Sequence, residues 1–245
     1  LEAGARCLPK KVKLVRDAVA KATGFTDGTE LAASPTYNPT PRPCGGWLTW
    51  DRFDVAGDTT AITKAWEGRS LVHSVGGGSS TILGMFSTSV LASTERRALM
   101  GISPGLGMSE WEDKHTGGAN AVFTRVRPTP TVHKHHYQAA LIWDDPSALL
   151  RRSDYYGYNG DHFGAVNPQG DKSTKGQTSE PTKIAGFTAS NNEVMFRNGI
   201  DLLGDEAPSR VICNKETRTQ LLNLFKKQGI THLAGKPVND VVIEH

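Results

Sequence analysis

Asn191-Asn192-Glu193-Val194-Met195-Phe196 places a single acidic residue at the head of a short apolar run. Val, Met and Phe are typical of a half-buried strand, so we expect a strand that contains Glu193. A carboxylate inside such a strand would be partly desolvated, and it would have either a raised pKa or a fixed partner. The alternative is an acid on an edge strand that points to water, and this stretch considered alone favours that alternative.

A second stretch, far upstream, changes the interpretation. Arg69-Ser70-Leu71-Val72-His73-Ser74 predicts a strand that ends in a histidine. Gly76-Gly77-Gly78 follows, and Ser79 or Ser80 then caps a helix. A strand, a glycine turn and a helix N-terminus together present backbone N–H groups to an anion or a carbonyl. The segment is not a P-loop, because no Lys-Ser or Lys-Thr pair follows the glycines, and it lacks the spacing of a Rossmann fingerprint.

Composition limits the class of protein. The 245 residues include 26 glycines and 13 prolines, which favours many loops and short strands over a helical bundle. The net charge of +3 permits a nucleic-acid partner but does not argue for one, since there is no dense basic run. The three cysteines match neither a metal-site spacing nor a disulfide framework, which favours a reducing compartment. No apolar run is long enough to span a bilayer.

The pattern along the chain predicts an arm and one domain. Residues 1–45 are expected to form a basic amphipathic helix over 9–22 and a proline-rich extended connector over 34–43. Residues 46–245 are expected to form an α+β domain of many short strands and few helices.

In this domain, the aromatic, acidic and glycine-containing segment over 154–164 is expected to form a turn-rich aromatic cluster or a substrate-stacking loop. Residues 216–228 are expected to form an amphipathic helix that Gly229 closes.

Two further features of that domain bear on function. The long polar loop over 101–118 holds Trp111, and a loop of this length inside a compact domain is usually functional or mobile. His133 and His135 would share one face of a strand, as metal ligands can. No cysteine or acidic residue nearby completes such a site, so we expect no metal.

The order of these elements resembles the ADP-ribosyltransferase superfamily, on the His-Tyr-Glu side shared by diphtheria toxin and the poly-ADP-ribose polymerases. The resemblance rests on the strand end Leu71-Val72-His73-Ser74, a helix with Ile82-Leu83, the strand Ala121-Val122-Phe123-Thr124, and the late Asn192-Glu193. It covers about residues 66–200, and the order and spacing of short motifs carry most of it. It implies a split β-sandwich of short strands with a few peripheral helices.

The resemblance also implies an activity and roles for particular residues. NAD would be the substrate, and Glu193 would stabilise the positive charge that grows on its ribose as the nicotinamide–ribose bond breaks. His73 would hydrogen-bond the adenine-side ribose, and the backbone of Ser74 would clamp the nicotinamide amide. Phe123 is the first choice for the ring that stacks on nicotinamide, and Trp111 the second. The tyrosine expected there is absent from this part of the sequence.

The acceptor of ADP-ribose is left open. Arginine-modifying members carry Gln or Glu two residues before the catalytic Glu, whereas this chain has Asn191, which could orient an acceptor but cannot act as a base. The resemblance implies a bacterial toxin or effector that modifies a protein or a nucleic acid, in the cytoplasm or in the cytosol of a target cell. An NAD glycohydrolase of the same fold and a non-catalytic module that binds a nucleotide or a partner remain alternatives.

Overall fold

The computed structural model describes residues 59–76, 79–94, 97, 121–129, 139–152, 154–161, 176–197 and 199–245. The arm predicted over 1–45, the loop with Trp111, and the histidine pair at 133 and 135 lie outside the described residues. Within the described part of the chain, no helix has the length and apolarity needed to cross a bilayer.

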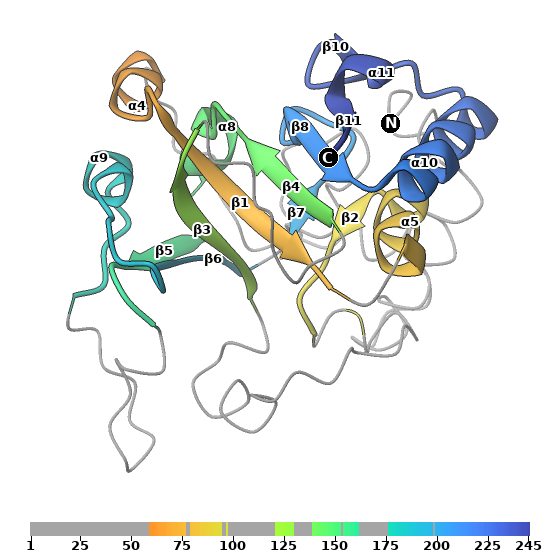
Figure 1. The fold of residues 1–245 in the computed structure, drawn as a ribbon. Coiled ribbons are helices and arrows are strands. Elements are labelled where there is room, and N and C mark those ends of the chain that lie inside the picture. Colours follow the sequence, from red (N-terminus) through yellow and green to blue (C-terminus); the bar gives the residue numbers. More distant parts are fainter. Residues whose placement is uncertain are drawn as a thin grey trace, which may run out of the picture.

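The described residues form an α+β fold around a seven-stranded mixed sheet in the order β11-β8-β4-β1-β3-β6-β5 (Figure 1). Its strands are β1 (Arg69–Val75), β3 (Val122–Pro128), β4 (Ala139–Trp143), β5 (Tyr155–Tyr158), β6 (Glu193–Phe196), β8 (Arg210–Cys213) and β11 (Val242–Glu244). Neighbours pair antiparallel except β11 and β8, which are parallel. Two small sheets pair β2 (Val90–Leu91) with β7 (Ile200–Asp201), and β9 (His232–Leu233) with β10 (Lys236–Pro237).

Six short or medium helices flank the sheet in the described ranges. They are α4 (Thr60–Ala65), α5 (Ser79–Thr88), α8 (Ser147–Leu150), α9 (Pro181–Ala185), α10 (Lys215–Gln228) and α11 (Val238–Val241). Figure 1 shows α5 and α10 together at one end of the sheet, and α4 and α9 together at the other. The rings of Phe86 and Phe225 join α5 to α10 edge to face, with their centroids 5.1 Å apart.

Helix α10 is capped at both ends, and its closing glycine is the one that the sequence predicts. Its N-cap residue Asn214 accepts a hydrogen bond from the Thr217 N–H at 2.8 Å through its side chain. Gly229 ends the helix with φ of 69°, a left-handed conformation that glycine adopts without a steric penalty.

The two faces of the large sheet carry different clusters, because successive strand residues point to opposite sides. The face that we call inner contributes to the main core, which includes Leu71, Val75, Val122, Leu141, Val194 and Phe196. The face that we call outer carries two smaller clusters. One consists of Val72, Ala140, Ile142 and Ile212. The other consists of Ala121, Tyr156, Tyr158 and Met195, with Phe123 packed against it.

The predicted strands around His73, Phe123 and Glu193 are confirmed, and β5 is the main difference from the sequence expectation. The aromatic, glycine-containing segment from residue 154 was expected to be a turn-rich cluster or a stacking loop. Its first part is instead a strand that pairs with β6. The segment alternates as a strand requires, because Tyr155 belongs to the inner core while Tyr156 and Tyr158 belong to the outer cluster.

Candidate functional site

Glu193 begins strand β6 and is 8% exposed, between β3 on one side and β5 on the other. The edge-strand alternative is therefore wrong. The carboxylate has an ion-pair partner: its Oε1 lies 3.8 Å from Nη2 of Arg125, whose own side chain is 47% exposed. Such a pair stabilises the charged carboxylate, while the exposed side of the guanidinium stays accessible to a second anion.

Aromatic rings lie beside this carboxylate on the outer face. Tyr158 stands opposite Glu193 in the β5–β6 ladder, and Tyr156 stands opposite Met195. The two tyrosine rings meet edge to face with centroids 6.0 Å apart. Burial raises the pKa of both phenols, so they stay protonated at neutral pH and cannot act as bases.

The backbone at Glu193 is held by side chains as well as by strand pairing. Thr124 Oγ1 donates to the Val194 carbonyl at 2.9 Å. The Asn192 side chain accepts from the Val126 N–H at 2.8 Å and donates to the Val126 carbonyl at 3.2 Å. On the other side, Gly157 lies so close that a Cβ there would approach the Glu193 carbonyl oxygen to 3.3 Å.

The pairing between β1 and β3 ends next to His73, and the two strands separate there. Its rungs run from Arg69↔Pro128 to Val72↔Arg125 and stop there, although β1 continues to Val75 and β3 begins at Val122. The His73 imidazole bridges the opening, with Nδ1 2.7 Å from the Phe123 carbonyl oxygen. A carbonyl can only accept, so Nδ1 carries the proton and Nε2 is the acceptor nitrogen of the neutral ring.

The protonation state of His73 agrees with this contact. Burial lowers the pKa of the imidazole, the hydrogen bond to Phe123 opposes that shift, and the positive charge of Arg97 adds to it. The ring is therefore neutral near pH 7.

The structure brings some predicted site residues together and separates others. Residues opposite each other in an antiparallel ladder project from the same face. His73 stands opposite Leu141 of the main core, whereas Glu193 stands opposite Tyr158 of the outer cluster, so these two side chains lie on opposite faces. Ser74 stands opposite Ala140, which places it on the outer face with Glu193 and Phe123.

Asn191 is the remaining predicted site residue in the described part of the chain. Asn191 is exposed in the turn before β6, whereas its neighbour Asn192 is buried and makes the contacts to Val126. The acceptor-orienting role of Asn191 stays a prediction. Sequence reasoning missed Arg125, which alternation places on the same side of β3 as Phe123.

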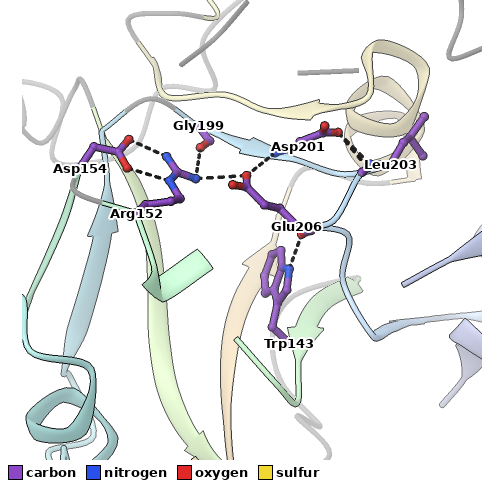
Figure 2. A network of polar contacts seen from close by, with 8 residues as sticks. Trp143, Arg152, Asp154, Gly199, Asp201, Leu203 and Glu206 are labelled. Carbon is purple, nitrogen blue, oxygen red and sulfur yellow. Dashed lines mark hydrogen bonds and ion pairs between the residues drawn. The ribbon is translucent and has the colours of Figure 1, made fainter. Parts of the chain in front are cut away.

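A buried polar network lies beyond the other end of β6 (Figure 2). Arg152 forms a two-pronged pair with Asp154 and also binds Glu206 at 3.3 Å and the Gly199 carbonyl at 2.8 Å. Its guanidinium also lies 5.2 Å from the centre of the Phe196 ring, at the end of the strand that begins with Glu193. The three charged side chains are at most 5% exposed, so they fix the chain there and do not present a surface to a ligand.

In the described ranges, no group of three or more His, Cys, Asp and Glu side chains is placed to hold a metal ion. Comparisons with protein-family models, with curated proteins and with solved structures found no match.

Proposed function

We propose that this chain is an NAD-dependent ADP-ribosyltransferase in which Glu193 is the catalytic carboxylate. The observation that carries the proposal is a buried carboxylate with an arginine 3.8 Å away, on an aromatic face beside an opened strand ladder. These are groups that can stabilise a cationic sugar, stack on a flat ring and bind a carboxamide.

The carboxylate would act on the ribose next to nicotinamide. In the reaction the bond between ribose C1′ and the nicotinamide nitrogen breaks, and its electron pair leaves with nicotinamide. A nucleophile of the acceptor then bonds to C1′ and gives its proton to solvent. The ribose passes through an oxocarbenium-like state, which a preorganised carboxylate stabilises. The Arg125 guanidinium lies beside the Glu193 carboxylate, and its exposed side suits a pyrophosphate oxygen.

The opening between β1 and β3 suits the nicotinamide amide. A primary carboxamide has one carbonyl acceptor and an NH₂ donor, as a neighbouring strand would. Beyond Val72, β1 has no further β3 rung in the described residues, and Ser74 lies in this section. The backbone of Ser74 is thus our candidate clamp, and Phe123, on the same face, is our candidate stacking ring.

His73 is given an indirect part in this proposal. Its imidazole lies on the inner face, so it cannot contact the same side of a ligand as Glu193 does. Its bond to the Phe123 carbonyl instead holds the candidate stacking residue where the ladder opens. A direct bond to the adenine-side ribose would have to come from Nε2.

The finer fold and the biological setting belong to the same proposal. The opening of the ladder at β3 supports a split β-sandwich of the ADP-ribosyltransferase kind, with β3 shared by both halves. We propose that the acceptor is a protein or a nucleic acid and that the chain acts as a toxin or effector in a cytosol.

Incubation of the protein with NAD labelled in its adenylate moiety and a whole-cell lysate tests the proposal. We expect nicotinamide release together with label in macromolecules, and separate nuclease and protease treatments identify the acceptor class. Nicotinamide release with no macromolecular label would replace the transferase by an NAD glycohydrolase. No release under any of these conditions would leave a binding module and overturn the proposal.

A further inference from the structure

The side chain of Asn192 replaces a backbone pair that β6 and β3 do not make. The β3–β6 ladder pairs Phe123 with Met195 and Thr124 with Val194, so continuing the register would put the backbone of Asn192 opposite Val126. That backbone has turned away from the sheet, because the Asn192 N–H donates to the Ala189 carbonyl at 3.1 Å. The side-chain amide instead binds both the N–H and the carbonyl of Val126.

This arrangement uses most of the hydrogen-bonding capacity of the amide. Besides its two bonds to Val126, the Asn192 NH₂ group donates to the Ala189 carbonyl at 2.6 Å. The residue is 1% exposed, so water does not compete strongly for these bonds. An aspartate could not donate to the two carbonyls, and an alanine would make none of the three bonds.

Glu193 therefore sits between two fixed points although it is the first residue of its strand. On its C-terminal side, Val194 is held by the ladder and by Thr124 Oγ1. On its N-terminal side, the chain is held by the Asn192 amide on Val126, the residue that follows Arg125. Glu193 pairs with Tyr158 on the β5 side, whereas the pairs with β3 in the described residues end at Val194. Without the Asn192 bond, only the β5 side would hold the chain before Val194.

We propose that Asn192 is a positioning residue, which holds the Glu193 carboxylate at the angle and distance that cleavage of the nicotinamide–ribose bond requires. The inference rests on the proposed function. It does not require Asn192 to touch NAD, so its loss affects the chemical step and leaves substrate binding largely intact. A displacement of about 1 Å in a reacting group can lower a rate about a hundredfold.

Steady-state nicotinamide release by Asn192→Ala, measured well below its melting temperature, tests the proposal. We expect kcat to fall about tenfold to a hundredfold while KM for NAD changes about twofold or less. The matched control is Asn214→Ala, which removes another asparagine–backbone bond at the N-cap of α10. It should lower the melting temperature without changing kcat. Unchanged kcat in Asn192→Ala, a rise in KM alone, or an equal loss in the control would overturn the proposal.

Two further measurements keep the result decisive. If Asn192→Ala does not fold, Asn192→Ser replaces it, because serine keeps one polar group. We expect this variant to fold with a reduced kcat and an unchanged KM for NAD. A kcat equal to that of the parent would overturn the proposal. Hydrogen exchange at the Val126 amide measures its bond to the Asn192 side chain and does not require enzymatic activity. If the parent releases no nicotinamide, the proposed function fails. Faster exchange at Val126 in the variant, with β4 amides still protected, then shows that the Asn192 side chain holds the Val126 backbone. Unchanged exchange shows that it does not.

Discussion

The side chains of His73 and Glu193 lie on opposite faces of the same seven-stranded sheet. Both are strand residues, and only β3 lies between their strands. Their separation follows from alternation along each strand and from the register that places His73 opposite Leu141 and Glu193 opposite Tyr158. In the proposed function, the chemistry takes place on the outer face, and His73 acts from the inner face through its hydrogen bond to the Phe123 carbonyl.

The partly buried, neutral His73 predicts a pH dependence of stability. The pKa of His73 in the folded protein lies below the ordinary value near 6.5. When the pH falls below about 6.5, the histidine therefore takes up a proton in the unfolded chain more readily than in the folded chain. Its contribution to stability is complete above about pH 6.5 and is lost as the pH falls towards the folded-state pKa. We expect the melting temperature to fall between pH 7.5 and 5.5 by less in His73→Gln than in the parent. Equal falls in both proteins would contradict this account of the histidine.

Arg125 is expected to support catalysis through its pair with Glu193. Replacing it by Gln removes the charge beside the carboxylate, and kcat/KM for NAD should fall about tenfold or more, equivalent to about 1.4 kcal/mol. The control is Arg151→Gln, because Arg151 makes an ion pair of the same 3.8 Å length with Asp205, outside the proposed site. Full activity in Arg125→Gln would remove the guanidinium from the site.

Gly157 is predicted to be required because β5 and β6 approach closely beside Glu193. A Cβ at this position would meet Phe187 Cε2 at 2.9 Å as well as the Glu193 carbonyl oxygen at 3.3 Å. Gly157→Ala should lower the free energy of unfolding by about 1–3 kcal/mol and reduce turnover, because relief of the clash shifts the strand that carries Glu193. Gly160→Ala, where a Cβ meets no atom within 4 Å, should do neither. Denaturant unfolding and nicotinamide release measure both effects.

The buried network around Arg152 predicts a large effect on stability. Arg152→Met leaves Asp154 and Glu206 without the guanidinium that they share, and breaking such a buried pair costs about 3–5 kcal/mol. Lys183→Met removes an exposed pair with Glu180 and should cost less than about 1 kcal/mol. Urea unfolding of the two variants separates these expectations. A small loss in Arg152→Met would mean that the network is not required for the fold.

Local patterns were sufficient to predict much of the sheet. The strands at His73, Phe123 and Glu193 follow from apolar, β-branched and aromatic runs, and α10 follows from an amphipathic pattern and a closing glycine. Strand β5 was not predicted, because its glycine and adjacent tyrosines also suit a turn. Only pairing with β6 decides between the two structures.

The site was harder to predict than the strands for the same reason. Which face a strand residue occupies depends on register and on which face of the sheet packs against the core, and both are tertiary properties. The separation of His73 from Glu193 and the hydrogen bonds of the Asn192 side chain follow from contacts with β4 and β3. Neither contact leaves a signal in the short motifs themselves.

The most direct test of the central claim is nicotinamide release from NAD by the parent, Glu193→Gln and Glu180→Gln. Glutamine keeps the size and hydrogen bonding of Glu193 but removes the charge. We therefore predict a native fold, retained NAD binding and turnover lower by about two to three orders of magnitude. Glu180 is exposed and paired with Lys183, so Glu180→Gln should match the parent. Parental turnover in Glu193→Gln would make Glu193 an ordinary strand acid and contradict the account.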